Sequence, residues 1–356
     1  MSCKSYPSEQ KEIAEQIIDI YSRFGVKLGN LISIEQGPRV SRYEFSLSPD
    51  TKISKITKLR DDISLMLSVP KVRLICPVPN KMAFAIEVPN KTEKFVDFDE
   101  VFKSNSFKNS ADKLCIALGK NLLNNNVYLE LSKSPHLLVG GCSCSGKTTL
   151  LKSVICSLIF NNTPSEVKLL LIAPKRDELE VFEKFEHLLS PVICDKHAAI
   201  EALNNLFKEC EERIKLFAAH SVRNIDAYNN KAKNKLPKIV AVIDEFSFLT
   251  SYKLRDFETV ISRLAQMGRM SGIHLVLSTK EFTPKNVTGI IKANIQTRIA
   301  LSTQNAIESR TVMDACDAEC LLLKGDLLLC DCILTKPQRI QAAYISDKKI
   351  KDFVNK

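Results

Sequence analysis

The chain has 356 residues, of which 45% are hydrophobic and 26% are charged, with 11 glycines and 14 prolines. This composition excludes a disordered, collagen-like or low-complexity protein, and the length favours two globular domains. Lysine and arginine number 51 against 41 acidic residues, and the net charge of +10 favours an acidic partner such as nucleic acid. No apolar run approaches the ~20 residues of a membrane span, and the first residues lack the apolar core of a secretory signal. We therefore expect a cytoplasmic protein with no membrane segment.

Residues 1–126 combine helical and strand-like segments and are expected to form a small α+β domain. Residues 8–24 place apolar side chains at helical spacing, and residues 53–69 form a second helical segment. Residues 39–49 alternate apolar and polar side chains, as a half-buried strand does. Two further apolar runs, 71–79 and 81–89, follow the second helix and meet at a turn. This pattern alone indicates only a packing or adaptor role.

Residues 127–356 show a different pattern, in which short apolar runs alternate with long amphipathic segments. The candidate strands are residues 136–140, 167–173, 191–194, 238–244, 273–279 and 297–301. Their continuous apolarity is typical of strands buried on both faces of a parallel sheet. Between them, residues 197–219 carry apolar side chains at alternating steps of three and four, which predicts a helix. The predicted fold class is α/β, with helices on both faces of a mainly parallel sheet.

Twelve cysteines are scattered through the chain, many of them in apolar stretches where cysteine packs as a small hydrophobic residue. We expect reduced thiols, as in the cytosol. Cys316, Cys320, Cys330 and Cys332 form the tightest group, but their spacing matches no common zinc site. Burial is therefore the favoured interpretation of this group.

The strongest chemical motif is GCSCSGKT at residues 141–148, which satisfies the P-loop pattern G-x-x-x-x-G-K-[ST]. It follows an apolar strand and precedes a helical segment, an arrangement in which backbone N–H groups surround a phosphate. Lys147 is expected to reach the β- and γ-phosphate oxygens, and the Thr148 hydroxyl to bind the Mg²⁺ that accompanies ATP. The predicted ATP-binding residues are Gly141, Cys142, Ser143, Cys144, Ser145, Gly146, Lys147, Thr148 and Thr149.

A second motif, KIVAVIDEF at residues 238–246, ends an apolar strand with two carboxylates. Ligands in open α/β sheets bind at the C-terminal ends of the strands. Asp244 is therefore expected to hold the hydration shell of the Mg²⁺ ion, and Glu245 to polarise the attacking water as a general base. A simpler alternative is that both residues only cap the following helix. The upstream P-loop favours ATP hydrolysis.

Beyond these two motifs, several segments follow one another in the order seen in FtsK/SpoIIIE-type DNA translocases. They are PHLLVGGCSCSGKTTLLKSVICSLIF, IAPKRDELEVFEKFEHLL, SVRNIDAYN, AVIDEFSFL, ISRLAQMGRMSGIHLVLST and IIKANIQTRIALSTQNAIESRTVMD. The resemblance covers residues 135–345, and residues 8–100 more weakly resemble the family's small domain that precedes the motor. It implies a RecA-like P-loop motor that forms a ring, usually hexameric, around double-stranded DNA and moves along it by hydrolysing ATP. Chromosome segregation at cell division and transfer of a mobile element's DNA are the settings it implies.

The resemblance also implies a role for an arginine outside the P-loop. Arg269 matches an arginine that resembles the family's finger, which acts on the ATP of a neighbouring subunit. Such an arginine neutralises charge that develops during phosphoryl transfer. The alternative for Arg269 is a solvated charge at a helix end. Arg310 is a second, weaker candidate for the same role.

Some residues depart from the family pattern. Thr279 matches the first residue of a Thr-Gln pair whose amide reads the γ-phosphate, but the next residue here is Lys280. A lysine could contact phosphate as a charge, yet it cannot both donate and accept hydrogen bonds as glutamine does. Ala173 stands where the family has an acidic residue. Three positions where the family has glycine are Cys144, Asp317 and Leu323.

Two other function classes fit parts of this pattern. A secretion-type ATPase with a protein cargo would need no DNA and would tolerate high salt. A non-hydrolysing nucleotide-binding scaffold is suggested only by Lys280 and Ala173, and the intact acidic pair argues against it. For the DNA motor, we expect no domain after residue 355 of the kind that reads orientation sequences in the family's chromosomal translocases. We therefore expect contact with the DNA backbone that is sensitive to salt.

Overall fold

The computed structural model describes residues 7–47, 51–79, 81–110, 112–331 and 336–354. The chain divides into two compact units: the first comprises Met1–Phe95, Lys120–Asn125 and Cys320–Leu322, and the second comprises the remainder. Within the described ranges, no helix is both long enough and apolar enough to span a lipid bilayer.

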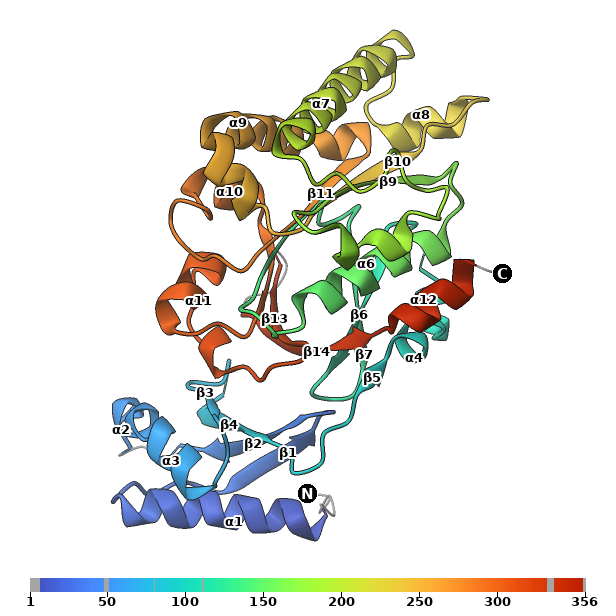
Figure 1. Ribbon diagram of the computed structural model, residues 1–356. Coiled ribbons are helices and arrows are strands. Elements are labelled where there is room, and N and C mark those ends of the chain that lie inside the picture. The colour runs from blue at the N-terminus through green and yellow to red at the C-terminus, as the bar shows by residue number, and fades with distance from the viewer. Residues whose placement is uncertain (1–6, 48–50, 80, 111, 332–335, 355–356) are drawn as a thin grey trace. The chain divides into compact units, whose positions relative to one another are not determined.

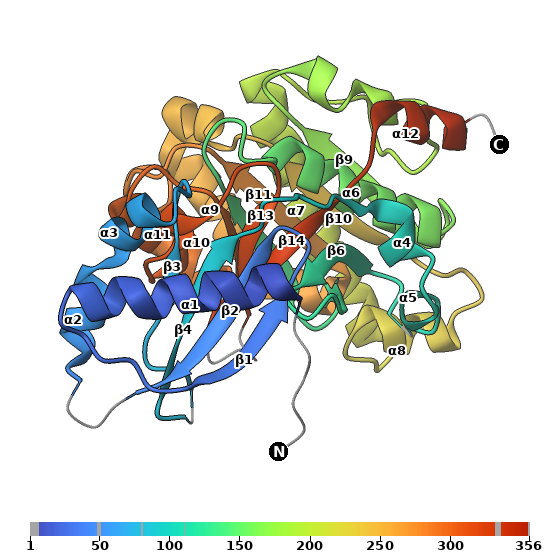
Figure 2. The same cartoon turned by 90° about the horizontal axis from the view of Figure 1, so that it is seen from below.

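The first unit is a four-stranded antiparallel sheet with the strand order β1-β2-β4-β3. Its elements are α1 (Ser8–Arg23), β1 (Leu31–Gln36), β2 (Val40–Ser46), α2 (Ile53–Lys58), α3 (Arg60–Met66), β3 (Arg73–Ile75) and β4 (Ala83–Pro89). Helix α1 lies across the sheet (Figure 2), and Tyr21 packs edge-on against Phe84 of β4 at 5.7 Å between ring centres. Phe84 also stacks on Phe45 of β2. These rings form the centre of the unit's core.

Two predictions for this unit differ from the structure. The predicted helix at 53–69 is interrupted at Leu59, so that α2 and α3 are separate helices. Each of them buries one isoleucine, Ile56 or Ile63, in the core. Strand β1 was not predicted, because its pairing with β2 is a tertiary contact that apolar periodicity does not reveal.

The second unit contains a ten-stranded sheet, flanked by helices (Figure 1). Its elements are β5 (Val96–Asp97), α4 (Phe98–Phe102), α5 (Asn105–Lys108), β6 (Cys115–Asn121), β7 (Asn126–Glu130), β8 (His136–Gly140), α6 (Lys147–Asn161), β9 (Val167–Ile172), η1 (Arg176–Glu178), η2 (Glu180–Phe182), α7 (Lys196–Ala219), α8 (Ile225–Lys231), β10 (Lys238–Ile243), α9 (Ser247–Ser271), β11 (Ile273–Thr279), α10 (Gly289–Asn294), β12 (Thr297–Leu301), α11 (Ala306–Met313), η3 (Ala318–Cys320), β13 (Asp326–Cys330), β14 (Gln338–Tyr344) and α12 (Asp347–Val354).

The sheet of the second unit is mixed, which corrects the predicted mainly parallel sheet. The strand order is β7-β6-β14-β13-β12-β8-β11-β10-β9, and the tenth strand, β5, pairs with β14 outside this path. The five strands from β12 to β9 are parallel to one another, but β13 pairs antiparallel with both β12 and β14. Only a few residues connect β13 to β14, too few for the crossover that a parallel pair requires. The prediction went wrong because it did not recognise these two strands.

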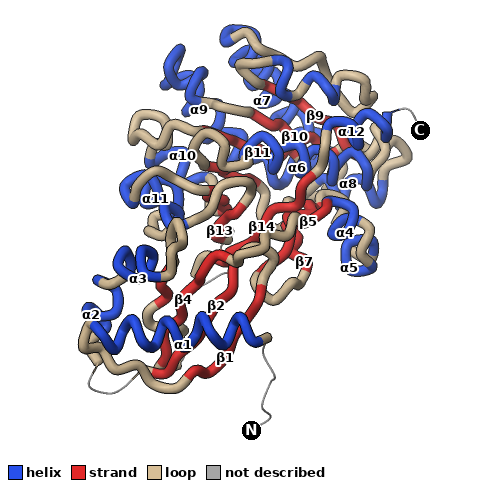
Figure 3. The backbone as a smooth tube through the Cα atoms, turned by 60° about the horizontal axis from the view of Figure 1, so that its bottom comes forward, coloured by secondary structure: helices blue, strands red, loops and turns tan. Residues whose placement is uncertain are grey.

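Helices cover both faces of the parallel part of the sheet (Figure 3). On one face, α6 packs with α4, η2 and α12 in a single apolar core. On the other face, α9 packs against β11 and α7 packs against α9. Strands β8 and β11 are buried along their whole length, as continuous apolarity predicts.

Two further expectations concern residues outside the regular strands. The predicted strand at 191–194 does not form: Ile193 makes only an isolated bridge to Ile172 of β9. In the cysteine group, Cys320 is buried, whereas Cys316 and Cys330 are half-buried. Cys332 lies outside the described residues.

Candidate functional site

The loop at residues 141–146 connects the end of β8 to the start of α6. Gly146 has a left-handed φ of +102°, and a Cβ at this position would lie 2.6 Å from the backbone nitrogen of Gly325. Gly325 donates its N–H to the carbonyl of Ser145 at 2.7 Å. Cys144 also has a left-handed φ, +63°, which explains why a related chain would have glycine there. The loop is thus held at the N-terminus of α6, where backbone N–H groups can bind a phosphate.

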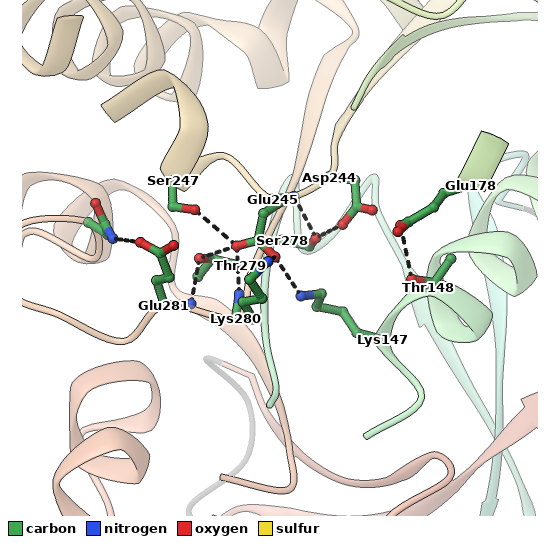
Figure 4. A network of polar contacts seen from close by, with 11 residues as sticks. Lys147, Thr148, Glu178, Asp244, Glu245, Ser247, Ser278, Thr279, Lys280 and Glu281 are labelled. Atoms are coloured by element: carbon green, nitrogen blue, oxygen red, sulfur yellow. Dashed lines mark hydrogen bonds and ion pairs between the residues drawn. The ribbon is translucent and has the colours of Figure 1, made fainter. Parts of the chain in front are cut away.

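Lys147, the first residue of α6, reaches toward the end of β10 (Figure 4). Its Nζ lies 3.0 Å from Oε2 of Glu245, and the two side chains are only 10% and 11% exposed. Glu245 has a left-handed φ of +52°, a strained conformation for a residue with a side chain. The structure therefore brings together the predicted phosphate-binding cation and the predicted general base.

The other carboxylate oxygen of Glu245, Oε1, accepts three hydrogen bonds. The donors are Ser247 Oγ at 3.0 Å, Thr279 Oγ1 at 3.1 Å and the backbone N–H of Lys280 at 2.9 Å. The Lys280 ammonium lies 3.8 Å from Oε2. Burial raises the pKa of Glu245, but the charge of Lys147 and the hydrogen bonds to the carboxylate outweigh it, so the pKa lies below its usual range. Glu245 is therefore held as an oriented, ionised carboxylate.

Asp244 is buried at the end of β10, and its Oδ1 accepts a hydrogen bond from Ser278 Oγ. The same Ser278 oxygen accepts the backbone N–H of Glu245 at 3.3 Å. Because β10 and β11 are parallel neighbours, the hydroxyls that end β11 face the carboxylates that follow β10. Sequence reasoning missed Ser278, although the Ser-Thr end of an apolar strand was a signal that could have identified it.

Thr148 contacts a carboxylate that was not predicted to belong to the site. Its Oγ1 donates to Oε2 of Glu178, the last residue of η1, at 3.3 Å. Burial raises the pKa of Glu178, and a hydrogen bond with Asp244 and the charge of Asp244 raise it further. Figure 4 shows this hydroxyl and the two carboxylates together. Hydroxyl and carboxylate oxygens form a donor set that fits a hard cation such as Mg²⁺.

The two arginine candidates lie at opposite edges of the sheet. Arg269 is in the last turn of α9, immediately before β11 begins, and so lies at the N-terminal edge of the strands. Lys147 and Glu245 lie at the C-terminal edge. Arg310 is in α11, which follows β12 at the C-terminal edge, and its Nε donates to Cys316 Sγ at 3.0 Å. Both arginine side chains are exposed. Fold geometry thus separates Arg269 from the nucleotide site of its own chain.

Comparison with protein families and curated relatives gives a consistent result. The FtsK/SpoIIIE family matches residues 98–284, and the FtsK alpha domain matches residues 2–90. The DNA translocase FtsK of Clostridium acetobutylicum is 43% identical over 355 residues, which cover 98% of this chain and 46% of the relative. The DNA translocase SftA of Bacillus subtilis is 41% identical over 345 residues, covering 95% of this chain and 36% of the relative. The chain thus spans less than half the length of these relatives.

A solved structure is similar over almost the whole chain. The pCW3 conjugation coupling protein TcpA, in a monomer form with ATPγS, superimposes with a TM-score of 0.67 and 22% sequence identity. The match covers 97% of this chain and 99% of that one. This likeness shows that the two chains share a fold.

Proposed function

Because this chain belongs to the FtsK/SpoIIIE family, we propose that it hydrolyses ATP to move along double-stranded DNA. The observation that carries the proposal is the contact of Lys147 with Glu245 at 3.0 Å, between the P-loop that follows β8 and the end of β10, two strands that both pair with β11. Two relatives that match nearly the whole chain at 43% and 41% identity are DNA translocases by name, which supports DNA as the substrate.

The proposed chemistry begins with the exchange of one partner of Lys147. The lysine leaves the carboxylate of Glu245 when a phosphate enters the P-loop at residues 141–149. Glu245 then keeps three hydrogen bonds, from Ser247, Thr279 and the N–H of Lys280. These bonds hold its orientation while Oε2 becomes available to accept a proton from the attacking water. Phosphate binding therefore also frees the Glu245 carboxylate from its ion pair with Lys147.

Mg²⁺ is the proposed metal, and Thr148 and Asp244 are the residues that would hold it. Their hydroxyl and carboxylate oxygens are the ligands this ion prefers. When bound, Mg²⁺ neutralises charge on the β- and γ-phosphates. Asp244 is only 2% exposed, and its hydrogen bond from Ser278 fixes the orientation of its carboxylate.

The proposed assembly is a ring of identical copies, hexameric as the resemblance implies, around the DNA. Residues 127–356 would be the motor, and residues 1–126 the small FtsK α-like domain. Arg269 lies at the N-terminal edge of the strands, away from the P-loop of its own chain, so we propose that it acts on the ATP of a neighbouring copy; Arg310 is the alternative. Backbone-directed DNA contact agrees with the net charge of +10.

The proposed compartment is the cytoplasm. The ten cysteines in the described part of the chain form no disulfide with one another, as expected in a reducing compartment. There the motor would act in chromosome segregation or in the transfer of a mobile element's DNA.

The test is the steady-state ATPase rate with and without linear duplex DNA. We expect DNA to stimulate the wild type, Lys147→Ala to abolish hydrolysis, and Lys184→Ala, at an exposed lysine, to behave as wild type. Stimulation should fall steeply between about 50 and 200 mM salt, because DNA contact releases counterions. Hydrolysis that ignores DNA at low salt would contradict a DNA motor and favour a protein cargo. A wild type without hydrolysis would favour a nucleotide-binding scaffold.

A further inference from the structure

Glu178 is a half-buried carboxylate whose hydrogen bonds belong to the nucleotide site. Its Oε2 accepts a hydrogen bond from the Thr148 hydroxyl at 3.3 Å, and the Asp244 carboxylate lies nearby (Figure 4). Lys147, which could neutralise this pair, is bound to Glu245 instead. Two carboxyl groups, each with its own hydroxyl donor, therefore lie close together at this site, an arrangement that a divalent cation stabilises.

We propose that Glu178 is a positioning residue for the metal ion of this site, acting through Thr148. A hydroxyl has one proton to donate and two lone pairs. When Glu178 accepts the hydrogen bond from this hydroxyl, the lone pairs of the Thr148 oxygen stay available to the cation. The negative charge of Glu178 also attracts the cation. This inference rests on the proposed function, because it concerns the Mg²⁺ that accompanies ATP.

The chain around Glu178 is anchored on both sides, which holds the carboxylate at the start of α6. The next residue, Leu179, and Phe182 are fully buried in the core of the unit. Arg176 donates two hydrogen bonds to Glu183, at 2.9 and 2.7 Å, and so ties η1 to the end of η2. A carboxylate held in this way loses little conformational freedom when a metal binds.

A simpler role for Glu178 would be stabilisation of α6 alone. A carboxylate near a helix N-terminus stabilises the helix by about 0.3–1 kcal/mol through the helix dipole. That effect requires no metal. The affinity for a metal, measured separately from nucleotide affinity and from stability, therefore distinguishes the two roles.

The experiment measures Mn²⁺ binding to the complex of the whole chain with ATPγS, from the paramagnetic resonance signal of free Mn²⁺. ATPγS affinity in EDTA is measured on the same proteins. Glu178→Gln keeps the size of the side chain and removes its charge, and Glu178→Ala removes both. Glu180→Gln, at an exposed position two residues away, is the matched control.

We expect the Kd for Mn²⁺ to rise about 10–100-fold in both Glu178 variants, as is typical when a residue that orients a metal ligand is lost. ATPγS affinity in EDTA should stay unchanged, and Glu180→Gln should match the wild type. In a Thr148→Ala background, the Glu178→Ala substitution should cost less than in the wild type, because the hydroxyl it orients is gone.

Mn²⁺ affinities within about twofold of wild type in both Glu178 variants would overturn the inference, since 10-fold or more is expected. A loss of thermal stability without a change in Mn²⁺ affinity would assign Glu178 to α6. If Glu178→Ala fails to fold, the Kd for Mn²⁺ of the isosteric Glu178→Gln variant tests the inference alone. A wild type that binds ATPγS but no Mn²⁺ would instead contradict the Mg²⁺ site of the proposed function. A wild type that binds no ATPγS would contradict its nucleotide site.

Discussion

The parallel strands β8, β10 and β11 have titratable side chains buried near both edges of the sheet, but only the C-terminal edge holds an ion pair. At the C-terminal end, Lys147 and Glu245 form an ion pair. At the N-terminal end, the rings of His136 and His274 lie 6.3 Å apart. Burial lowers the pKa of His136 to about 3, with a contribution from His274. Burial lowers the pKa of His274 to about 4, with a contribution from Lys238.

The hydrogen-bond partners explain this difference. His136 Nδ1 accepts the N–H of Leu275 at 3.1 Å, and Nε2 lies 3.0 Å from the carbonyl of Ala265, so backbone groups satisfy the neutral ring. Glu245 instead faces the ammonium of Lys147, a partner that an entering phosphate can take away. Burial of a titratable group therefore does not mark a functional residue by itself. A charged partner that a ligand can replace does.

We call the N-terminal edge of the strands, with His136 and His274, the neutral edge, and the C-terminal edge, with Lys147 and Glu245, the ionised edge. The largest expected effect concerns Arg269, which lies at the neutral edge. If this arginine acts on the site of a neighbouring subunit, Arg269→Ala should lower the DNA-stimulated ATPase rate about 10³-fold or more. Mixing this variant with Lys147→Ala, which cannot hydrolyse ATP but retains Arg269, should restore part of the rate. The measurement is the ATPase rate of the mixture against that of each variant alone.

An unchanged rate in Arg269→Ala together with a large loss in Arg310→Ala would assign the role to the ionised edge. The same result would mean that the neutral edge is purely structural.

The next largest effect concerns the ionised edge itself. Glu245→Gln should lower the ATPase rate about 10²–10⁴-fold, because an amide cannot accept a proton from water. ATPγS affinity should not fall, since Lys147 no longer has to leave a carboxylate. Rates and ATPγS affinities are measured beside Glu211→Gln, an exposed control on α7. A Glu245→Gln variant that hydrolyses ATP at the rate of this control would show that Glu245 is not the general base.

The neutral edge predicts a pH dependence of stability. Both histidines have a lower pKa in the folded chain than in the unfolded chain, so the unfolded state binds more protons. The free energy of unfolding therefore decreases as the pH is lowered. The loss should begin near pH 6.5, the usual histidine pKa, and continue toward the folded values near 4 and 3. At pH 5 it amounts to about 2 kcal/mol for each histidine.

Urea unfolding between pH 7 and pH 5 measures this loss. In His274→Gln, which cannot gain a proton, the decline should be shallower by about 2 kcal/mol at pH 5 than in the wild type. Equal slopes in the two proteins would mean that His274 is not buried in the neutral form.

The smallest expected effect concerns the backbone of the P-loop. Cys144→Gly should raise the free energy of unfolding by about 1 kcal/mol, because glycine adopts the left-handed φ of +63° without steric cost. Cys144→Ala removes the thiol but keeps the Cβ, and should show no such gain. The comparison requires urea unfolding of the three proteins. A glycine variant less stable than the alanine variant would show that the side chain contributes contacts that outweigh the strain.

The contrast between the two edges also shows how far sequence reasoning reached. The P-loop and the acidic pair were predicted at the positions where the structure has them, because both motifs follow apolar strands. Ser278 and Glu178 were missed, since neither stands in a motif with a fixed spacing. Their relevance comes from contacts with Asp244 and Thr148, and these contacts depend on which strands are neighbours.

The sequence by itself determined the local features: the loop before α6, the carboxylates after β10, and strands apolar enough to be buried on both faces. These features follow from residue types a few positions apart. The tertiary structure decided that β13 and β14 make the sheet mixed, that Glu178 meets Thr148, and that Arg269 lies at the edge away from its own site. Each of these outcomes depends on strand order and direction, which local periodicity does not encode.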